Sequence, residues 1–273
     1  MNSLHFSRLL GQHEFWLGLL VVALAVGLSV STDEFLSLGN LTDVATSYAI
    51  LGILACGLFV VLISGGIDIS FPAMTAIAQY AMASWVIGHG GNFALALVIA
   101  IAVGLLLGLI NGFLVYWLRV PAIIITIATL NVYYGLLVYA TKGTWLYGFP
   151  DWFMNGINWF SFTAADGYDY GLTLPLLCLA AVIIVTAVLM NYTRLGRQVY
   201  AMGGNRDAAS RLGLNLLKLH FYVYGYMGIL AGVAAVVQAR ITQSVAPNSL
   251  LGFELTVLAA VVLGGTSLSG GRG

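Results

Sequence analysis

Apolar stretches alternate with short polar links along most of this chain. The interiors of the seven longest stretches contain no acid, lysine or arginine. A helix of about 20 such residues crosses the hydrocarbon core of a bilayer and satisfies its own backbone hydrogen bonds there. The pattern therefore predicts seven membrane-spanning helices, at residues 15–30, 44–63, 71–88, 93–118, 120–139, 172–190 and 219–239.

An eighth apolar run covers residues 253–263, and as a helix it would rise only about 16 Å, too little to cross a bilayer alone. A polar and aromatic segment, residues 142–171, separates the fifth and sixth predicted helices. The expected fold is therefore an all-α, polytopic transmembrane helical bundle with about eight membrane segments.

Composition supports a membrane protein and narrows the kinds of function. Hydrophobic residues make up 60% of the chain and charged residues only 7%, against about 25% charged in a soluble domain. The formal net charge is zero, so no basic surface indicates a nucleic-acid partner. Cys56 and Cys178 each lie in an apolar run with no histidine nearby, and they predict neither a metal site nor a disulfide framework.

The basic residues orient the chain in the membrane. With the N-terminus inside, only Lys142 and Arg240 fall on the outer side. The inner side receives Arg8, Arg119, Arg194, Arg197, Arg206, Arg211, Lys218 and Arg272. Because cytoplasmic loops of membrane proteins carry an excess of lysine and arginine, the N-terminus is expected in the cytoplasm.

The chain lacks the residues that would let it power transport by itself. A phosphate-binding loop needs Gly-Lys-Ser/Thr, but Lys142 is followed by glycine and Lys218 by leucine. Ion-coupled carriers usually place ionisable groups inside the membrane, and the spans have none in their interiors. No Ser/His/Asp or Cys/His arrangement is visible, so no catalytic residues and no enzyme activity are expected.

The cytoplasmic loop at residues 191–218 holds half of the basic residues. We expect a turn at residues 200–205, followed by a short helix at 206–212. Asn205 is expected to cap this helix, and the negative charge of Asp207 stabilises its N-terminus. Gly213 is expected to end it. Asn215 is expected to cap the following helix. The loop either lies on anionic headgroups or docks onto a partner protein. The candidate docking residues are Gly203, Gly204, Asn205, Arg206, Ala208, Ala209, Arg211 and Gly213.

Two short segments resemble each other and suggest an internal duplication. Gly-Gly-Ile-Asp-Ile-Ser at 65–70 and Gly-Gly-Thr-Ser-Leu-Ser at 264–269 each follow an apolar run. Duplicated halves are common in transporters, although two unrelated Gly-Gly turns would give the same pattern. We expect Asp68 and Ser70 to cap the helix that follows them. The motif residues are Gly65, Gly66, Asp68, Ser70, Gly264, Gly265, Ser267 and Ser269.

A few polar side chains lie within the predicted spans: Asn111, Thr126, Thr129 and Asn131. They either hydrogen-bond one helix to another or line a path for a neutral polar solute such as a sugar. Thr126 and Thr129 are three residues apart and share a helix face, whereas Asn131 points elsewhere.

Several of these stretches resemble the permease subunits of bacterial ABC importers for ribose, related simple sugars and autoinducer-2. They are residues 64–70, 120–124, 195–197, 201–205 with Ala208-Ala209, and 263–273. The resemblance implies about ten membrane segments and a bacterial inner-membrane location. It also implies a second permease chain (in a homo- or heterodimer), a cytoplasmic ABC ATPase that binds ATP and Mg, and a periplasmic solute-binding protein. In such families the Gly-Gly-Asn loop resembles the segment that contacts the ATPase.

The interpretation we favour is a permease subunit that moves a neutral polar solute by alternating access. The alternatives are a secondary, ion-coupled carrier and a non-transporting membrane subunit. Residues 1–273 are expected to form one transmembrane permease domain that is truncated at its C-terminus. The reason is that the second Gly-Gly unit is followed by no helix, whereas the family continues with two or three more.

Overall fold

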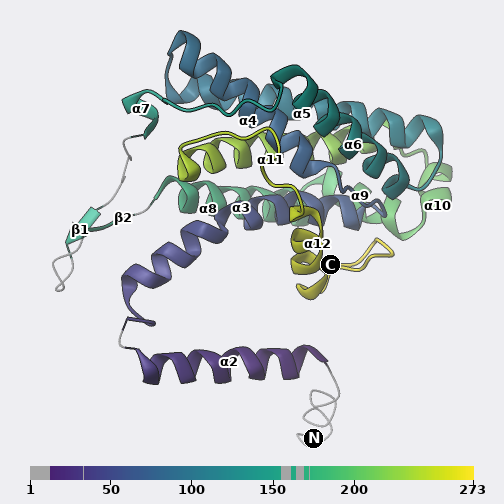
Figure 1. Ribbon diagram of the computed structural model, residues 1–273. Helices are drawn as coiled ribbons and strands as arrows, with labels where there is room; N and C mark the ends of the chain where they lie inside the picture. The colour runs from purple at the N-terminus through teal and green to yellow at the C-terminus, as the bar shows by residue number, and fades with distance from the viewer. Residues whose placement is uncertain (1–12, 33, 155–160, 164–168, 172) are drawn as a thin grey trace, which may run out of the picture. The chain divides into compact units, whose positions relative to one another are not determined.

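A computed structural model describes residues 13–32, 34–154, 161–163, 169–171 and 173–273 (Figure 1). The chain divides into two compact units, which are described separately. One comprises Met1–Ser47 with Ser161–Tyr170, and the other comprises Tyr48–Phe160 with Gly171–Gly273.

The smaller unit contains α2 (His13–Ser31) and the first part of α3 (Leu38–Ile63). It also contains β1 (Ser161–Thr163) and most of β2 (Asp169–Gly171), which pair as a two-stranded sheet. Apolar side chains of α2 such as Leu20 and Val22 are exposed, as expected of a helix that faces lipid.

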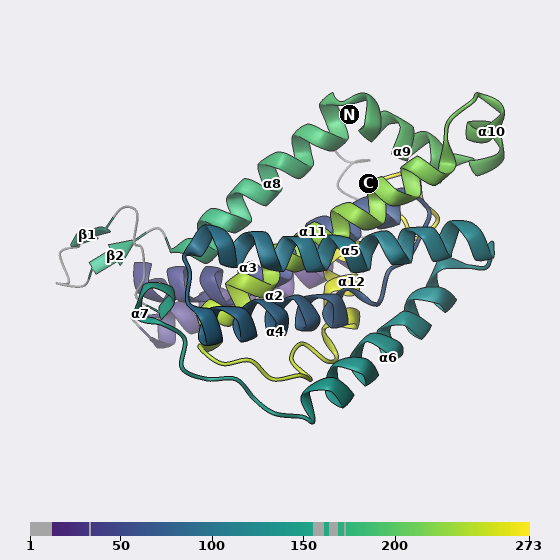
Figure 2. The same cartoon turned by 90° about the horizontal axis from the view of Figure 1, so that it is seen from above.

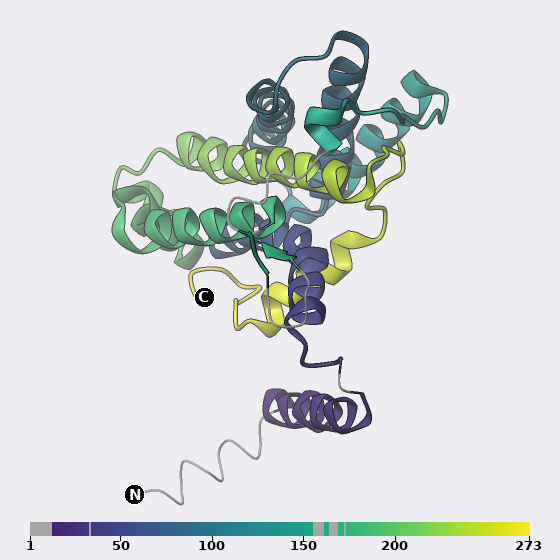
Figure 3. The same ribbon diagram turned by 90° about the vertical axis from the view of Figure 1, so that its left-hand side faces the viewer.

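Within the described residues, the larger unit holds the rest of α3 and nine further helices. These are α4 (Phe71–His89), α5 (Phe93–Leu118), α6 (Ala122–Thr141), α7 (Asp151–Met154), α8 (Leu174–Tyr192), α9 (Arg194–Gly204), α10 (Arg206–Arg211), α11 (Leu216–Thr242) and α12 (Phe253–Leu263). Figures 1 and 3 show α11 between a layer of α4, α5 and α6 and a layer of α3 and α8.

Helix α11 is the centre of this unit. Within its most apolar window 78% of the residues are buried, compared with 22% in the corresponding windows of α5 and α8. Gly57 of α3 faces Met227 of α11, and Gly52 of α3 faces Leu179 of α8. The buried apolar side chains of α3, α4 and α11 form most of one continuous core. The outer helices turn their remaining apolar surface outward, which is the arrangement that a lipid surrounding favours.

Five described helices are long and apolar enough to cross a membrane: α3, α5, α6, α8 and α11. Gly18–Ser31 of α2 and Phe253–Leu263 of α12 are shorter apolar helices, and the 19-residue α4 stands between α3 and α5. The predicted polytopic helical fold is confirmed. The bounds of α5 and α12 coincide with those predicted, whereas α6 begins only at Ala122 because the residue before a proline disfavours helix.

Helices α5 and α11 approach so closely that their backbones touch (Figure 2). A Cβ atom added at Gly104 would collide with the carbonyl oxygen of Gly228, and one at Gly108 would collide with the carbonyl oxygen of Tyr224. A Cβ atom at Gly112 would lie 2.9 Å from the carbonyl oxygen of His220. Glycines at every fourth position therefore form a small-residue stripe, which lets two membrane helices gain dispersion contacts along their length.

We predict that Gly108→Ala lowers the stability of the protein by about 1–3 kcal/mol, because the added methyl group must push two backbones apart. Gly135→Ala is the matched control, since no atom lies within 4 Å of its Cβ position in α6. The measurement is thermal unfolding in detergent, followed by size-exclusion chromatography. Equal melting temperatures for the two variants would contradict a backbone contact between α5 and α11.

Candidate functional site

The segment from Thr193 to Gly204 is helical for most of its length, so the predicted turn at 200–205 is wrong. The Thr193 Oγ1 accepts a hydrogen bond from the backbone N–H of Gly196 at 3.1 Å and caps α9. Gly196, Val199 and Met202 are buried at intervals of three residues. This apolar face holds α9 in helical form through Gly204, overriding the turn preference of the glycine pair.

The short helix after Asn205 forms as predicted. The Asn205 Oδ1 accepts a hydrogen bond from the Ala208 N–H at 2.9 Å and caps α10, which ends at Arg211, one residue before the predicted end. Gly213 has a φ of 80°. Its N–H donates to the Ser210 carbonyl oxygen, and the Leu214 N–H donates to the Ala209 carbonyl oxygen, so the helix ends in a Schellman motif.

The next helix also begins at the predicted cap, because the Asn215 Oδ1 accepts a hydrogen bond from the Lys218 N–H at 3.0 Å. Within the predicted docking segment Ala209 is buried and Gly203 is half-buried. The exposed members are Gly204, Asn205, Arg206, Ala208, Arg211 and Gly213. The segment thus presents small and basic residues on a locally capped backbone, together with the exposed side chains of Asp207 and Leu212.

Three glycine segments that are far apart in the sequence meet at the end of α9. A Cβ atom added at Gly203 would collide with the carbonyl oxygen of Ile63, the last residue of α3. One added at Gly270 would lie 2.7 Å from the Cα of Gly65, and the Gly271 N–H donates to the Ile63 carbonyl oxygen at 2.9 Å. The docking segment is therefore attached to the end of α3 and to the last residues of the chain by backbone contact.

This junction was not predicted from the sequence. The glycine pair at 65–66 resembles the pair at 264–265, but neither pair was expected to contact Gly203. The available signal was the occurrence of glycine pairs at the ends of three apolar or helical segments, since backbone-to-backbone contact requires residues without a Cβ atom.

The ends of α3 and α12 have the same local structure. The N–H groups of Gly65 and Gly66 donate to the carbonyl oxygens of Leu62 and Val61, and those of Gly265 and Thr266 donate to Val262 and Val261. Gly65 has a φ of 83° and Gly265 a φ of 99°. Both ends are Schellman motifs.

At the helix ends, the matching residues are shifted by one from the expected pairing, because Gly65 corresponds to Gly265 and not to Gly264. The residues that follow match as expected, with Asp68 paired to Ser267 and Ser70 to Ser269. The Asp68 Oδ1 accepts from the Ser70 N–H at 2.7 Å, and the Ser267 Oγ accepts from the Ser269 N–H at 3.2 Å. The two segments therefore share a helix end followed by a side-chain turn.

The prediction that Asp68 and Ser70 cap the following helix is wrong. Ser70 stands at the N-cap position of α4, but its φ of −85° and ψ of −9° are helical and its side chain makes no capping bond. An N-cap oxygen bonds the N–H of the second or third helical residue, and Pro72, the second, has none. No helix follows Ser267 and Ser269 among the described residues, which extend to Gly273.

Ser70 instead connects Asp68 to Asn111 of α5. Its Oγ donates to the Asp68 Oδ1 at 2.6 Å, and the Asn111 Nδ2 donates to the same Oγ at 2.6 Å. The Tyr133 hydroxyl of α6 donates to the Asn111 Oδ1 at 3.1 Å. A chain of hydrogen bonds between buried side chains thus joins the link before α4 to α5 and α6, where each bond is stronger than in water.

The Asp68 carboxyl is buried in the link between α3 and α4, and its Oδ2 has no partner among the described residues. Desolvation raises the pKa of Asp68 to about 6, although the hydrogen bonds from Ser70 and Asn111 oppose the rise. The carboxyl therefore binds its proton far more readily than an exposed aspartate does.

The four predicted solute-path residues fall into two groups. Asn111, Thr126 and Thr129 are buried, and the Thr126 Oγ1 donates to the Ile67 carbonyl oxygen at 3.0 Å. The Thr129 Oγ1 donates to the Thr126 carbonyl oxygen at 3.3 Å. Asn131 is exposed and donates to the Ile127 carbonyl oxygen in its own helix. The expectation that Asn131 points away from the two threonines is confirmed, whereas a role in solute binding stays a prediction.

The described residues contain no group of three or more His, Cys, Asp or Glu side chains that could hold a metal ion. The two cysteine side chains, Cys56 and Cys178, are half-buried thiols without a disulfide.

We predict that Asn111→Ala destabilises the protein by about 1–3 kcal/mol, because it removes the bonds to Ser70 and Tyr133 and leaves a cavity. Asn131→Ala removes the same side chain from an exposed site and is expected to change stability by less than about 0.5 kcal/mol. Thermal unfolding of both variants in one detergent measures the difference. A smaller loss for Asn111→Ala than for Asn131→Ala would refute the importance of the buried chain of bonds.

A family model described as "Branched-chain amino acid transport system / permease component" matches residues 40–271. The ribose import permease protein of Bacillus subtilis strain 168 is 32% identical over 272 residues, which cover 100% of this chain and 82% of the relative. That of Escherichia coli strain K12 is 32% identical over 93% of this chain and 77% of its own length. The D-allose transport system permease protein of the same strain is 30% identical over 93% of this chain and 76% of its own length.

No solved structure matches the chain. The family match covers most of the sequence and includes the docking segment and the Gly-Gly link before α4, so the resemblance noted in those residues is confirmed. A multi-pass arrangement of apolar helices is what a transport permease requires. The chain belongs to this family of membrane permease components of transport systems.

Proposed function

We propose that the chain is the transmembrane permease subunit of an ATP-binding-cassette importer for a simple sugar or a similar neutral polar solute. The observation that carries the proposal is the construction of residues 193–213. Capped helices make this segment rigid, backbone contacts at Gly203 tie it to the end of α3, and its exposed face combines small and basic residues with the apolar side chains of Leu195 and Leu212. A segment that transmits a partner's motion needs both a firm attachment and an accessible surface.

The solute path lies beside the polar face of α5 and α6. Asn111, Thr126 and Thr129 supply hydrogen-bonding groups without charge, which suits the hydroxyl groups of a sugar. Relatives of this chain are import permeases for ribose and D-allose. Because Asn111 and Thr126 pair with atoms of the 64–70 link, they become available to solute only when α5 and α6 move relative to that link, whereas Thr129 pairs within α6. Asn131, on another face of α6, is a less direct candidate.

The remaining subunits follow from this assignment. The chain pairs with a second permease chain, identical or related, in the bacterial inner membrane. A periplasmic solute-binding protein delivers the solute. A cytoplasmic ABC ATPase binds ATP and Mg, hydrolyses the ATP and docks on the 191–218 loop of the permease domain. The excess of basic residues on the loop side supports a cytoplasmic N-terminus.

Uptake by the reconstituted importer tests the proposal against its alternatives. Vesicles that contain the permease with the ATPase and binding protein of its own transport system are expected to accumulate ribose or another simple sugar when ATP is present. Accumulation is expected to persist when a protonophore collapses the ion gradients. Loss of uptake with the protonophore would indicate an ion-coupled carrier, and no uptake of any sugar would indicate a non-transporting subunit.

We predict that Gly204→Val and Gly213→Val uncouple ATP hydrolysis from uptake. No atom lies within 4 Å of either Cβ position, so the new side chain at Gly204 projects from the proposed docking face rather than into the protein. At Gly213 the φ of 80° is unfavourable for valine, so the turn that ends α10 distorts.

Gly88→Val is the control, because Gly88 is exposed at the far end of α4 and its Cβ position is also open. Both docking variants are expected to insert normally but to lose at least about tenfold in uptake per ATP hydrolysed, and the control is expected to retain the wild-type ratio. Wild-type ratios for Gly204→Val and Gly213→Val would rule out this segment as the coupling surface.

A further inference from the structure

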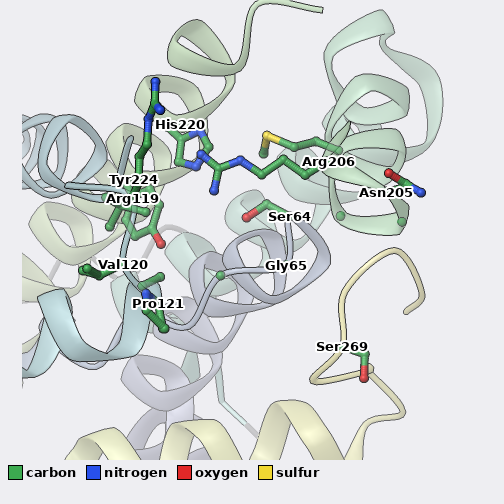
Figure 4. Close-up of a pocket in the computed structure, with 16 residues that line it drawn as sticks. Ser64, Gly65, Arg119, Val120, Pro121, Asn205, Arg206, His220, Tyr224 and Ser269 are labelled. Carbon is green, nitrogen blue, oxygen red and sulfur yellow. The ribbon is translucent and has the colours of Figure 1, made fainter. Parts of the chain in front are cut away.

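A cavity of about 430 Å³ opens beside the docking segment (Figure 4). Its walls are the link after α3, the end of α5 with the turn to α6, the last turn of α9 with the start of α10, one face of α11, and Ser269 after α12. This volume falls in the range of sites that hold small molecules. The cavity is separate from the Asn111 and Thr126 face, and neither of those residues lines it.

The charged side chains in the walls of this cavity are cationic. Arg119 at the end of α5 and Arg206 at the start of α10 both line it, and no aspartate or glutamate is among the described lining residues. Figure 4 shows the Arg206 side chain extending from α10 toward His220. His220 and Tyr224 line the same cavity as Arg206. A guanidinium held next to a buried imidazole favours an anion between the walls.

Tyr224 adds an independent sign of a missing ligand. Its side chain is 1% exposed and lines the cavity, yet its hydroxyl has no hydrogen-bond partner among the described residues. An unpaired buried hydroxyl destabilises the folded protein, so such groups usually have a partner. Gly66 leaves room beside it, since a Cβ atom there would lie 2.6 Å from the hydroxyl oxygen.

Two other polar groups near the cavity are Asp68 and His220. The Asp68 carboxyl does not line the cavity; its Oδ1 accepts from Ser70, and its Oδ2 has no partner among the described residues. The His220 Nδ1 faces the Leu216 carbonyl oxygen at 2.7 Å, so it donates there. The Tyr224 hydroxyl and the guanidinium groups of Arg119 and Arg206 are donors in the lining that a ligand in the cavity can use.

We propose that this cavity binds a phosphate group, carried by a soluble phosphate ester or by an anionic lipid headgroup. The guanidinium groups of Arg206 and Arg119 neutralise its charge, and the Tyr224 hydroxyl donates a hydrogen bond to one of its oxygens. Guanidinium groups bind phosphate through paired N–H donors, and a tetrahedral oxyanion accepts donors from several walls at once. This ligand differs from the neutral solute of the proposed transport function, and the proposal does not depend on that function.

Binding of inorganic phosphate to the purified protein in detergent tests the site. Phosphate at constant ionic strength, with chloride as the balancing anion, is expected to raise the melting temperature of the wild type in a saturable way. Arg206→Gln and Tyr224→Phe are expected to weaken the apparent affinity by about tenfold or more. Tyr224→Phe is also expected to raise the melting temperature without phosphate, because it removes the unpaired buried hydroxyl.

Matched controls separate the site from general charge effects. Arg197→Gln removes an exposed arginine of α9, and Tyr222→Phe removes a hydroxyl of α11; neither residue lines the cavity. Both are expected to bind phosphate as the wild type does. Equal weakening in the controls and the site variants would overturn the proposal.

A lipid comparison distinguishes the two sources of phosphate. The wild type and Arg206→Gln are compared in phosphatidylcholine nanodiscs with and without phosphatidylglycerol. Stabilisation of the wild type alone by phosphatidylglycerol, with no response to inorganic phosphate, assigns the site to a lipid headgroup. A response to inorganic phosphate in the absence of phosphatidylglycerol assigns it to a soluble ester. If neither ligand stabilises the wild type more than Arg206→Gln, the site does not bind phosphate.

Discussion

The backbone contact between α5 and α11 is the constraint on which the larger unit depends. Lipid supplies no hydrophobic force that drives membrane helices together, so close packing must hold them. Gly104, Gly108 and Gly228 provide that packing because no side chain stands between the two backbones. The contact buries α11 at the centre of the unit. It also fixes the positions of Asn111 on α5 and Tyr224 on α11, two buried polar side chains.

A second region depends on this arrangement. With α5 held against α11, Asn111 lies within hydrogen-bonding distance of Ser70 and Tyr133, and the link between α3 and α4 becomes part of the packed interior. Asp68 then lies in a site that water does not reach, which accounts for its raised pKa. Buried hydrogen bonds of this kind break together when the helices that carry them move. The side chains that stabilise one conformation therefore lose their partners when the protein changes to another.

The proposed docking segment and the proposed phosphate site share their supporting residues. Gly203 contacts the end of α3, while the neighbouring Arg206 reaches across the cavity toward α11. An anion between Arg206 and Tyr224 would add a charged link from α10 to the centre of the unit. Occupancy of the cavity would then alter how firmly the docking segment is held, because the ligand contacts both parts.

The sequence by itself determined the features that depend on neighbouring residues. Apolar stretches predicted the helices, with the bounds of α5 and α12 correct, and Asn205, Asn215 and Gly213 act as the predicted caps and helix end. Caps and Schellman motifs form within about six residues, so local pattern is sufficient to identify them.

Only the tertiary structure decided the rest. The buried face of α9 made residues 200–204 helical, Ser70 bonded to Asn111 instead of capping α4, and Gly203 met Ile63 and Gly271. The cavity also combines residues from five separate parts of the chain. Each of these contacts joins residues that are tens to hundreds of positions apart. Their distance in space is set by how whole helices pack, and no local pattern of residue types encodes it.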